Sequence, residues 1–198
     1  LQDNHGFSIF LSQSLTPHTT TNLVFAISSG STALTASVDL TKNTGSFNHC
    51  ACVFSRNNDE LSRLKIFRDG VLVATSSQTA NIGTLNFKAA NLNIGSGSDH
   101  YLGTYEETFE PTTTLSASID DIRLYSTEKN QIQIQQIASG TYGHDNSLLA
   151  FYKFNEATGS YVNNSVVLDS SGNSLHAQVQ NFDSVLRVKE ISSPVVNE

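Results

Sequence analysis

The sequence contains no methionine, no tryptophan and only two cysteines. Because translation starts with methionine, we expect the chain to be a mature product or a piece of a longer precursor. The first residues lack the charged and apolar regions of a secretory signal, and no run approaches the roughly 18 apolar residues that a membrane helix requires. The sequence therefore predicts no membrane insertion.

Basic residues are also scarce. The chain has 11 Lys and Arg residues against 18 Asp and Glu residues, which gives a formal net charge of -7. Nucleic acids and anionic membranes are bound through clustered basic side chains, so this balance argues against both as partners. It suits cations and neutral ligands better.

The two cysteines, Cys50 and Cys52, are separated by one residue within an apolar run. In a strand their side chains would lie on the same face about 6.6 Å apart, which is too far for a relaxed disulfide. We therefore expect two buried free thiols. A metal site is a weak hypothesis here, because no second cysteine pair or spaced histidine pair follows.

Alternation of apolar and polar residues is the main pattern, and Leu34, Ala36, Val38 and Leu40 are the clearest example. A period of two is typical of a half-buried strand. Similar runs occur at residues 7–11, 23–27, 47–54, 64–67, 71–74, 92–94, 115–124, 149–154, 175–179 and 185–188. Many short strands between Gly, Asn and Ser clusters predict an all-β sandwich of two antiparallel sheets.

Two local patterns are more specific. Asp69 and Gly70 separate two strand-like runs, and this dipeptide favours a two-residue hairpin turn because both turn residues need positive φ. One short helix is predicted around residues 132–137, with Ser126 as its N-cap and Gly140 at its C-terminal end. We expect this helix to cover one end of the sandwich.

Four segments together resemble the laminin G-like domains of the concanavalin A-like lectin/glucanase superfamily. FNHCACV (residues 47–53) is similar to a family strand with an aromatic residue and a histidine pair, here with phenylalanine for the usual tryptophan and asparagine at the first histidine. LKIFRDGVLVA (64–74) resembles the family's Asp-Gly hairpin, LNIGS (92–96) the strand after it, and IDDIRLY (119–125) the closing strand. The resemblance implies a jelly-roll sandwich that works by binding.

A fifth resemblance falls in an unexpected place. LAFYKFNE (149–156) and DSSGN (169–173) resemble the opening of such a domain but follow the closing strand, whereas GFSIF (6–10) resembles the strand after the opening. The chain is either circularly permuted or cut from a tandem array. We favour one domain over residues 1–198, with residues after about 145 completing the sandwich, because permutation requires only that the termini lie close together.

Oxygen-rich side chains at two places are candidate calcium ligands. The alternation of apolar and polar residues shifts by one position at Asp120 and Asp121, which predicts a β-bulge there. Hard oxygen donors at a bulge would suit Ca²⁺. Asp169 and Asn173 flank a Ser-Ser-Gly segment with the composition of a calcium loop but not its twelve-residue pattern. The alternatives are an acid that binds a neighbouring loop or Arg123, and an ordinary Asx turn. The resemblance implies that the two places lie near each other.

A long insert between Gly95 and Leu115 is the candidate ligand-binding loop. Loops that project from a rigid sandwich often carry recognition, and aromatic and acidic side chains can stack on and hydrogen-bond a sugar. The alternative is a solvated connection whose aromatic residues pin it to the surface. The candidate ligand-binding residues are Asp99, His100, Tyr101, Tyr105, Glu107 and Phe109. A smaller segment, residues 142–146, is interpreted as a link from the helix to the next strand.

The sequence shows no catalytic pattern. A glucanase of the superfamily would need two carboxyl groups about 5 Å apart on one strand face, and neither the acid pair nor the glutamates of the insert alternate in that way. A nucleophile elbow and a phosphate-binding glycine loop are also missing. His49 is interpreted as a packed strand residue, and the chain is predicted not to be an enzyme.

We therefore expect an extracellular or surface-displayed binding or adhesion module that recognises a glycan or a surface protein, with calcium as the candidate ion. The expected location is outside the cell or on a cell or virion surface, within a longer precursor. Two alternatives remain open. One is a structural unit of an appendage or virion that self-associates in an array by strand donation, and the other is an accessory carbohydrate-binding domain of a larger enzyme.

Overall fold

The computed structural model describes residues 5–13, 21–40, 46–57, 61–85, 92–95, 100–101, 108–109, 115, 117–143, 145–156 and 166–179. The chain divides into two compact units, Leu1–Ser116 with Asn130–Gln135, and Ala117–Lys129 with Gln136–Glu198. Antiparallel strands and one short helix make up the regular structure of the described residues, which confirms the all-β sandwich class. No helix in this part of the chain is long and apolar enough to cross a membrane.

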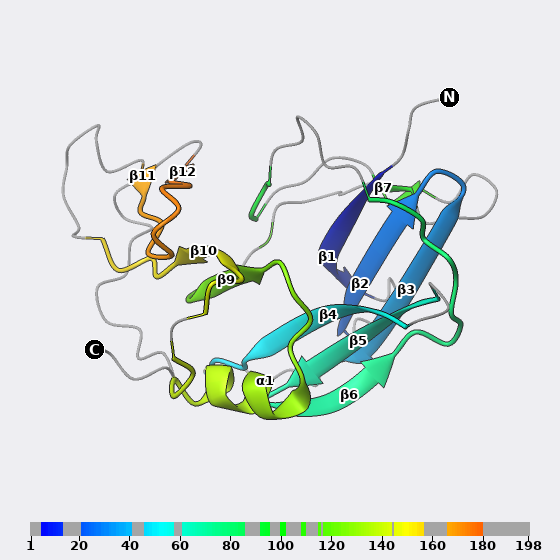
Figure 1. The fold of residues 1–198 in the computed structure, drawn as a ribbon, viewed down its shortest axis with the longest axis horizontal. Coiled ribbons are helices and arrows are strands. Elements are labelled where there is room, and N and C mark those ends of the chain that lie inside the picture. The colour runs from blue at the N-terminus through cyan, green and yellow to red at the C-terminus, as the bar shows by residue number, and fades with distance from the viewer. Residues whose placement is uncertain are drawn as a thin grey trace. The chain divides into compact units, whose positions relative to one another are not determined.

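The first unit contains a sheet of β1 (His5–Gln13), β2 (Thr21–Ser29) and β3 (Thr32–Asp39), in that order (Figure 1). Both pairings are antiparallel and run without a register shift. The central strand β2 is buried along most of its length, because it has a neighbour on each side and apolar residues on both faces. All three strands predicted in this part of the sequence are confirmed.

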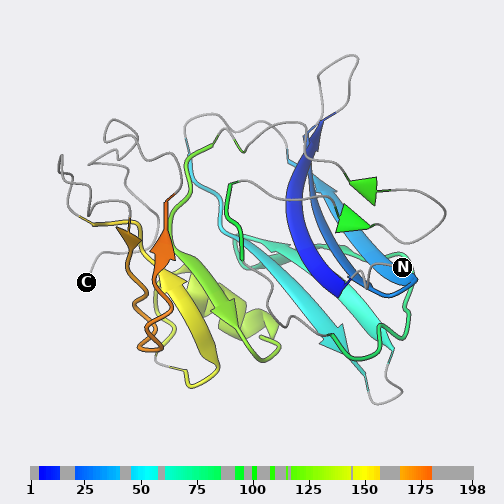
Figure 2. The same ribbon diagram turned by 90° about the horizontal axis from the view of Figure 1, so that it is seen from above.

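A second sheet of the same unit contains β4 (Cys50–Arg56), β5 (Ser62–Arg68) and β6 (Val71–Thr75). Asp69 and Gly70 form the β5–β6 connection with φ values of 49° and 78°, which confirms the predicted two-residue turn. The two sheets form separate layers (Figure 2), and β3 packs against β5 and β6.

Apolar side chains fill the space between these layers. Leu64 and Ile66 of β5 are fully buried on the face turned toward β2 and β3. Ile82 joins them from outside the strands, because the chain after β6 returns along β5 through a bridge between Ser62 and Ala80. The buried residues of this core are Leu23, Phe25, Ile27, Leu34, Ala36, Leu64, Ile66 and Ile82.

Helix α1 (Gln131–Ala138) agrees with the helix predicted around residues 132–137, but its N-cap differs. Its N-cap is Asn130 and not Ser126, because Asn130 Oδ1 accepts the N–H of Gln133 at 3.0 Å while the N–H of Asn130 donates to Gln133 Oε1 at 2.9 Å. This reciprocal pair is a capping box. At the other end Gly140, with φ of 72°, closes the helix in a Schellman motif, so the predicted C-terminal end is confirmed.

The helix was expected to cover one end of the sandwich, but it covers the face of a sheet instead. Ile134 of α1 packs against Val53 of β4 and Phe67 of β5. These two residues alternate along their strands with residues that face the other sheet. The β4–β5 pair is therefore buried on both faces, by β1–β3 on one side and by α1 on the other.

The second unit is built on the antiparallel pair β9 (Ile122–Tyr125) and β10 (Leu148–Tyr152). The short strands β11 (Val166–Val167) and β12 (Ala177–Gln178) pair with each other. The core of this unit contains Ala150, Tyr152 and Val167, against which Ile122, Leu124, Phe154, Ala177 and Val179 pack. Strands after α1 thus pair with the strand before it, while completion of the first unit by residues after about 145 stays a prediction.

Some predicted strands differ from the structure. Residues 92–94 are not a strand, and the predicted strand at 115–124 is reduced to β9, because regular pairing begins only after Asp121, whose φ is 51°. The predicted bulge at the acid pair is wrong, since the register shifts at Leu149 on the opposite strand. The predicted strand at 185–188 lies outside the described residues.

Both cysteines are free thiols. Cys52 packs against the core between the two sheets, and this burial raises its pKa to about 12. Cys50 is exposed at the first position of β4. The prediction that both thiols are buried is therefore wrong for Cys50.

Replacing Gly70 by alanine should destabilise the first unit more than the same change at Gly30. Both glycines have positive φ, 78° and 60°, which costs an alanine about 1–2 kcal/mol. A Cβ at Gly70 would also lie 2.6 Å from Cγ of Gln135 on α1, whereas nothing lies within 4 Å at Gly30. Such overpacking adds about 1–3 kcal/mol. Chemical denaturation measures both losses, and equal losses would contradict the proposed contact.

Candidate functional site

The insert predicted to bind a ligand is closed at its base. The N–H of Leu115 donates a hydrogen bond to the carbonyl oxygen of Gly95 at 2.7 Å. The two ends of the insert, Gly95 and Leu115, are therefore held together. A loop anchored in this way can carry recognition residues without altering the sheets beneath it.

Within this insert the chain forms a short hairpin. Strand β7 (His100–Tyr101) pairs with β8 (Thr108–Phe109), and His100 lies directly opposite Phe109. Figure 1 shows β7 on the side of the first unit that carries β1. The structure thus brings together the backbone of three predicted ligand-binding residues. The other three, Asp99, Tyr105 and Glu107, lie outside the described residues.

Asp169, a predicted calcium ligand, has a carboxylate that accepts four hydrogen bonds. Its Oδ1 accepts the N–H groups of Phe151 and Ser171, each at 2.9 Å. Its Oδ2 accepts the Ser171 hydroxyl at 2.7 Å and the N–H of Leu175 at 3.0 Å. Burial disfavours the charged form, but these four bonds outweigh it and lower the pKa of Asp169 to about 2. The side chain therefore fastens the turn that follows β11 to β10.

Asn173 fastens the same turn at its other end. Its side-chain nitrogen donates to the carbonyl oxygens of Leu148 at 2.9 Å and Leu149 at 3.0 Å, where the register of β10 shifts. The amide thus satisfies backbone acceptors at the irregular part of the strand. Both predicted ligands of this turn therefore have structural hydrogen bonds, and the bond from the N–H of Ser171 to Asp169 Oδ1 is that of an Asx turn.

The acid pair lies just before β9. Asp120 Oδ1 accepts the N–H of Asp121 at 3.0 Å. Burial raises the pKa of Asp121, the nearby charges of Arg123 and Lys153 lower it, and the charge of Asp120 raises it. Arg123 also lies 4.2 Å from the ring centroid of Phe151, so its cation contacts an aromatic ring.

The register of the second unit separates the two predicted calcium regions. Ile122, the residue after the acid pair, is opposite Tyr152, and Tyr152 bridges to Asp169 on its other side. Two strand spacings amount to about 10 Å. The regions thus lie on opposite sides of β10, and the described residues contain no group of three His, Cys, Asp or Glu side chains that could hold a metal. Calcium binding stays a prediction.

A buried ion pair in the second unit was missed by the sequence analysis. Lys129 is only 7% exposed, and its Nζ lies 2.7 Å from Asp145 Oδ2 and 2.6 Å from Ser147 Oγ. The Tyr142 hydroxyl donates to the same Asp145 oxygen at 2.6 Å, and the Lys129 Nζ lies 4.7 Å from the Tyr125 ring centroid. The bonds from Lys129 and Tyr142 hold the pKa of Asp145 far below its ordinary value.

This cluster explains the segment after the helix. Residues 142–146 were interpreted as a link, and Tyr142 and Asp145 clamp that link onto Lys129 in front of α1. The sequence signal for this cluster was Lys129 before the helix and Tyr142 after it, with Asp145 three residues beyond Tyr142. Because Asp145 binds both Lys129 and Tyr142, the cluster holds this link in place.

The backbone groups of His49 also have a structural role. Its N–H donates to Asp69 Oδ1 at 2.9 Å, and the N–H of Asp69 donates to the His49 carbonyl oxygen at 2.8 Å. This exchange fixes the β5–β6 turn against the start of β4. The residue precedes β4 and is half-buried.

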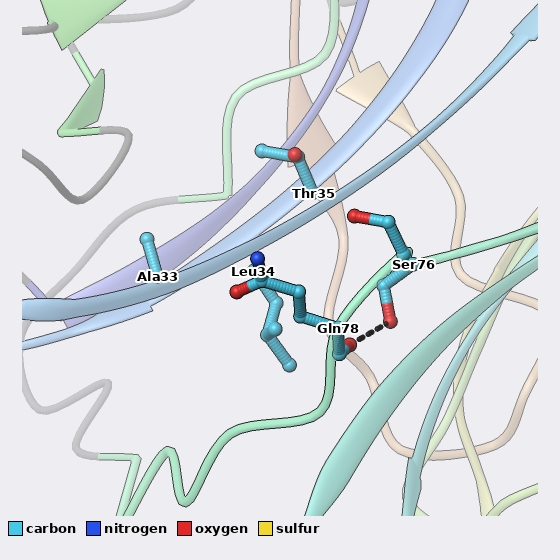
Figure 3. Close-up of a pocket in the computed structure, with 6 residues that line it drawn as sticks. Ala33, Leu34, Thr35, Ser76 and Gln78 are labelled. Carbon is cyan, nitrogen blue, oxygen red and sulfur yellow. Dashed lines mark hydrogen bonds between the residues drawn. The ribbon is translucent and has the colours of Figure 1, made fainter.

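A shallow depression of about 210 Å³ opens beside β3 (Figure 3). Ala33, Leu34 and Thr35 form one wall, and Ser76, Ser77 and Gln78 form the other. The Ser76 hydroxyl donates to the Gln78 carbonyl oxygen at 2.7 Å. The depression is smaller than ordinary ligand pockets of about 300–1,000 Å³, and none of the predicted ligand-binding residues lines it.

A family model described as the concanavalin A-like lectin/glucanases superfamily matches residues 2–135, which is more than half of the chain. The chain belongs to this superfamily. The match runs from the segment before β1 into α1, and β10, β11 and β12 lie beyond it. Neither the curated proteins nor the solved structures gave a significant match.

Membership in the concanavalin A-like lectin/glucanase superfamily supports a general role in binding carbohydrate or protein. Laminin G-like domains are generally binding modules without catalysis, although the superfamily also includes glycosidases. The prediction that this member is not an enzyme stays a prediction.

Replacing Asp169 by asparagine should flatten the acid dependence of stability in this superfamily member. A folded pKa of about 2 lies below the unfolded value of about 3.9, so the carboxylate stabilises the fold above pH 4 and this contribution is lost as pH falls toward 2. Urea unfolding across this pH range measures the effect. Asp39→Asn removes an exposed carboxylate of β3 and controls for the lost charge. An unchanged pH profile in Asp169→Asn would contradict the assignment.

Proposed function

We propose that this chain is a non-catalytic binding module that recognises a glycan or a surface protein through the insert at residues 96–114. The superfamily match supports binding as the general role. The closed base at Gly95 and Leu115 is the observation that carries the choice of this loop. It holds the two ends of the insert together, and loops carried on a rigid scaffold often hold recognition residues.

The chemistry of the insert favours a neutral glycan. Its hairpin pairs His100 with Phe109 and places Tyr101 beside them in sequence, so rings are concentrated on two short strands. Aromatic rings present apolar faces to sugar C–H groups, and Tyr and His add hydrogen-bonding groups. The net charge of -7 disfavours long-range attraction of an anionic ligand.

We further propose an extracellular or surface location within a longer protein, as is typical of laminin G-like domains. The alternatives are a structural assembly unit of an appendage or virion and an accessory carbohydrate-binding domain of a larger enzyme. The proposed function and the two alternatives all use the same scaffold. They differ in whether the module binds a sugar, binds a copy of itself, or serves a neighbouring catalytic domain.

Excision of the insert tests the binding site. Residues 96–114 are replaced by Asn-Gly, because the bond from Leu115 to Gly95 then closes an ordinary four-residue turn. We expect the excised chain to keep its melting temperature and lose binding to an array of neutral oligosaccharides. The loss follows because the predicted ring contacts are removed while both sheets remain.

The variants His100→Ala and Phe109→Ala should each weaken the same binding within the intact insert. Thr35→Ala, an exposed position on β3, serves as the matched control and should bind as the parent chain does. Binding that survives excision would show that the ligand is held elsewhere. A parent chain that binds none of the arrayed oligosaccharides would contradict the glycan proposal.

Calcium is proposed as an accessory ion, with Asp120 and Asp121 as its main ligands. The carboxylate oxygens of Asp169 already accept four N–H and O–H donors, so a cation there would have to displace these bonds. The Asn173 amide nitrogen is likewise used by two backbone carbonyls. Of the predicted donors, the acid pair therefore fits an oxygen-seeking ion better.

Calcium should raise the stability of the chain through the acid pair. At about a hundredfold excess over the dissociation constant, a ligand that binds only the folded state adds about 2.7 kcal/mol. The melting temperature in calcium and in chelator measures this effect. Asp120→Asn should abolish the difference, whereas Asp169→Asn should lower both values and leave the difference. Equal melting temperatures for the parent chain would contradict calcium binding.

A further inference from the structure

The outer face of the β9–β10 pair carries two cations that share one aromatic ring. Arg123 of β9 lies directly opposite Phe151 of β10, and its guanidinium lies 4.2 Å from the ring centroid. Lys153 follows Phe151 by two residues and points to the same face, and its Nζ lies 5.3 Å from the same centroid. The intervening Tyr152 belongs to the core of the second unit. Two positive charges are therefore gathered on the face that points away from this core.

Neither of these cations is neutralised within the described part of the chain. The ion pair found there joins Lys129 to Asp145, and neither Arg123 nor Lys153 forms one. Both side chains are half-buried, and Nε of Arg123 is buried without a hydrogen-bond partner. The guanidinium does hydrogen-bond the Tyr125 hydroxyl, which is a neutral group. Part of this cation has thus lost its water without gaining an anion, and a charge in such surroundings attracts an anion more strongly than a fully solvated one.

Asp121 reduces the positive charge of this face without cancelling it. Its carboxylate interacts electrostatically with Arg123 and Lys153 but forms an ion pair with neither. The neighbouring Asp120 uses its Oδ1 to accept the N–H of Asp121. Two cations against the one carboxylate that interacts with both leave a positive balance, although the whole chain has a net charge of -7.

An exposed leucine borders the two cations. Because Tyr152 bridges to Asp169 in the antiparallel sense, Leu168 lies beside Lys153 on the outer face. Leu168 is 52% exposed, whereas the preceding Val167 is 4% exposed and belongs to the core. The hydroxyl groups of a sugar need hydrogen-bonding partners, which a leucine side chain does not offer. This surface therefore suits a ligand in which an apolar group lies next to an acidic group.

We propose that this cationic face, formed by Arg123, Phe151, Lys153 and Leu168, binds an acidic peptide segment of a partner protein. A carboxylate of the peptide accepts charged hydrogen bonds from the guanidinium and the ammonium group, and an adjacent apolar side chain packs on Leu168. The positive balance of the face selects the acidic group, and the leucine selects a peptide over a sugar. All four residues belong to the second unit, so the site is separate from the insert that is proposed to bind a glycan.

Fluorescence anisotropy on the full chain tests the proposal with a short labelled peptide in which Glu and Leu alternate. Binding should weaken about tenfold when Gln replaces Glu in the peptide, and about tenfold in Arg123→Gln and in Lys153→Gln, because each change removes charged hydrogen bonds. Arg63→Gln removes the same charge from an exposed position of β5 and should bind as the parent chain does. A chelator is present throughout, so the proposed calcium has no part in the result. Circular dichroism shows whether each variant is folded.

Asp121→Asn provides a measurement that damage to the fold cannot imitate. The φ of Asp121 is 51°, a conformation that asparagine also adopts readily, so the backbone should be kept. Removing this negative charge beside the two cations should tighten binding of the acidic peptide about twofold or more. The chain with residues 96–114 excised should bind the peptide as the parent chain does, which separates this site from the proposed glycan site.

Failure of the parent chain to bind the acidic peptide would overturn the proposal. Equal affinity for the Glu and Gln peptides would also overturn it, and so would unchanged binding in both Arg123→Gln and Lys153→Gln. An acidic oligogalacturonide that binds more tightly than the peptide, and that loses binding in the same two variants, would assign the face to an acidic glycan and overturn the choice of a peptide.

Discussion

The first unit depends on burial of the β4–β5 pair from both sides. Leu64 and Ile66 face the β1–β3 sheet, whereas Phe67 faces Ile134 of the helix. Fully burying one such side chain contributes about 1.5–3 kcal/mol, so this pair supplies much of the apolar stabilisation of the unit. The glycine at position 70 fits this arrangement, because a Cβ there would lie 2.6 Å from Cγ of Gln135 on α1.

Strand β3 was predictable because only one of its faces is buried. In β3 the residues Leu34 and Ala36 are buried and their neighbours are not, so alternation shows directly in the sequence. The hairpin at Asp69 was predictable because its turn needs two positive φ values. The helix start was not, since both Ser126 and Asn130 are good N-caps, and only the reciprocal bond with Gln133 decides between them.

The candidate calcium turn shows why composition alone could not settle the site. An Asx turn and a calcium loop both use Asp, Ser, Gly and Asn, and they differ only in whether the oxygens meet N–H groups or an ion. In the structure Asp169 meets N–H groups that come from β10 and from its own turn. The clamp between Lys129 and Asp145 was hidden for a related reason, because its two charges are separated by an entire helix in the sequence.

The hydrogen bond that joins Gly95 to Leu115 bears on how this scaffold can diversify. The entropy of closing a flexible loop grows slowly with its length, by about 0.6 kcal/mol for each doubling. Once the two ends are held together, the intervening residues can be lengthened, shortened or exchanged at small cost to folding. The length and sequence of this insert can therefore change with little effect on the stability of the sheets beside it.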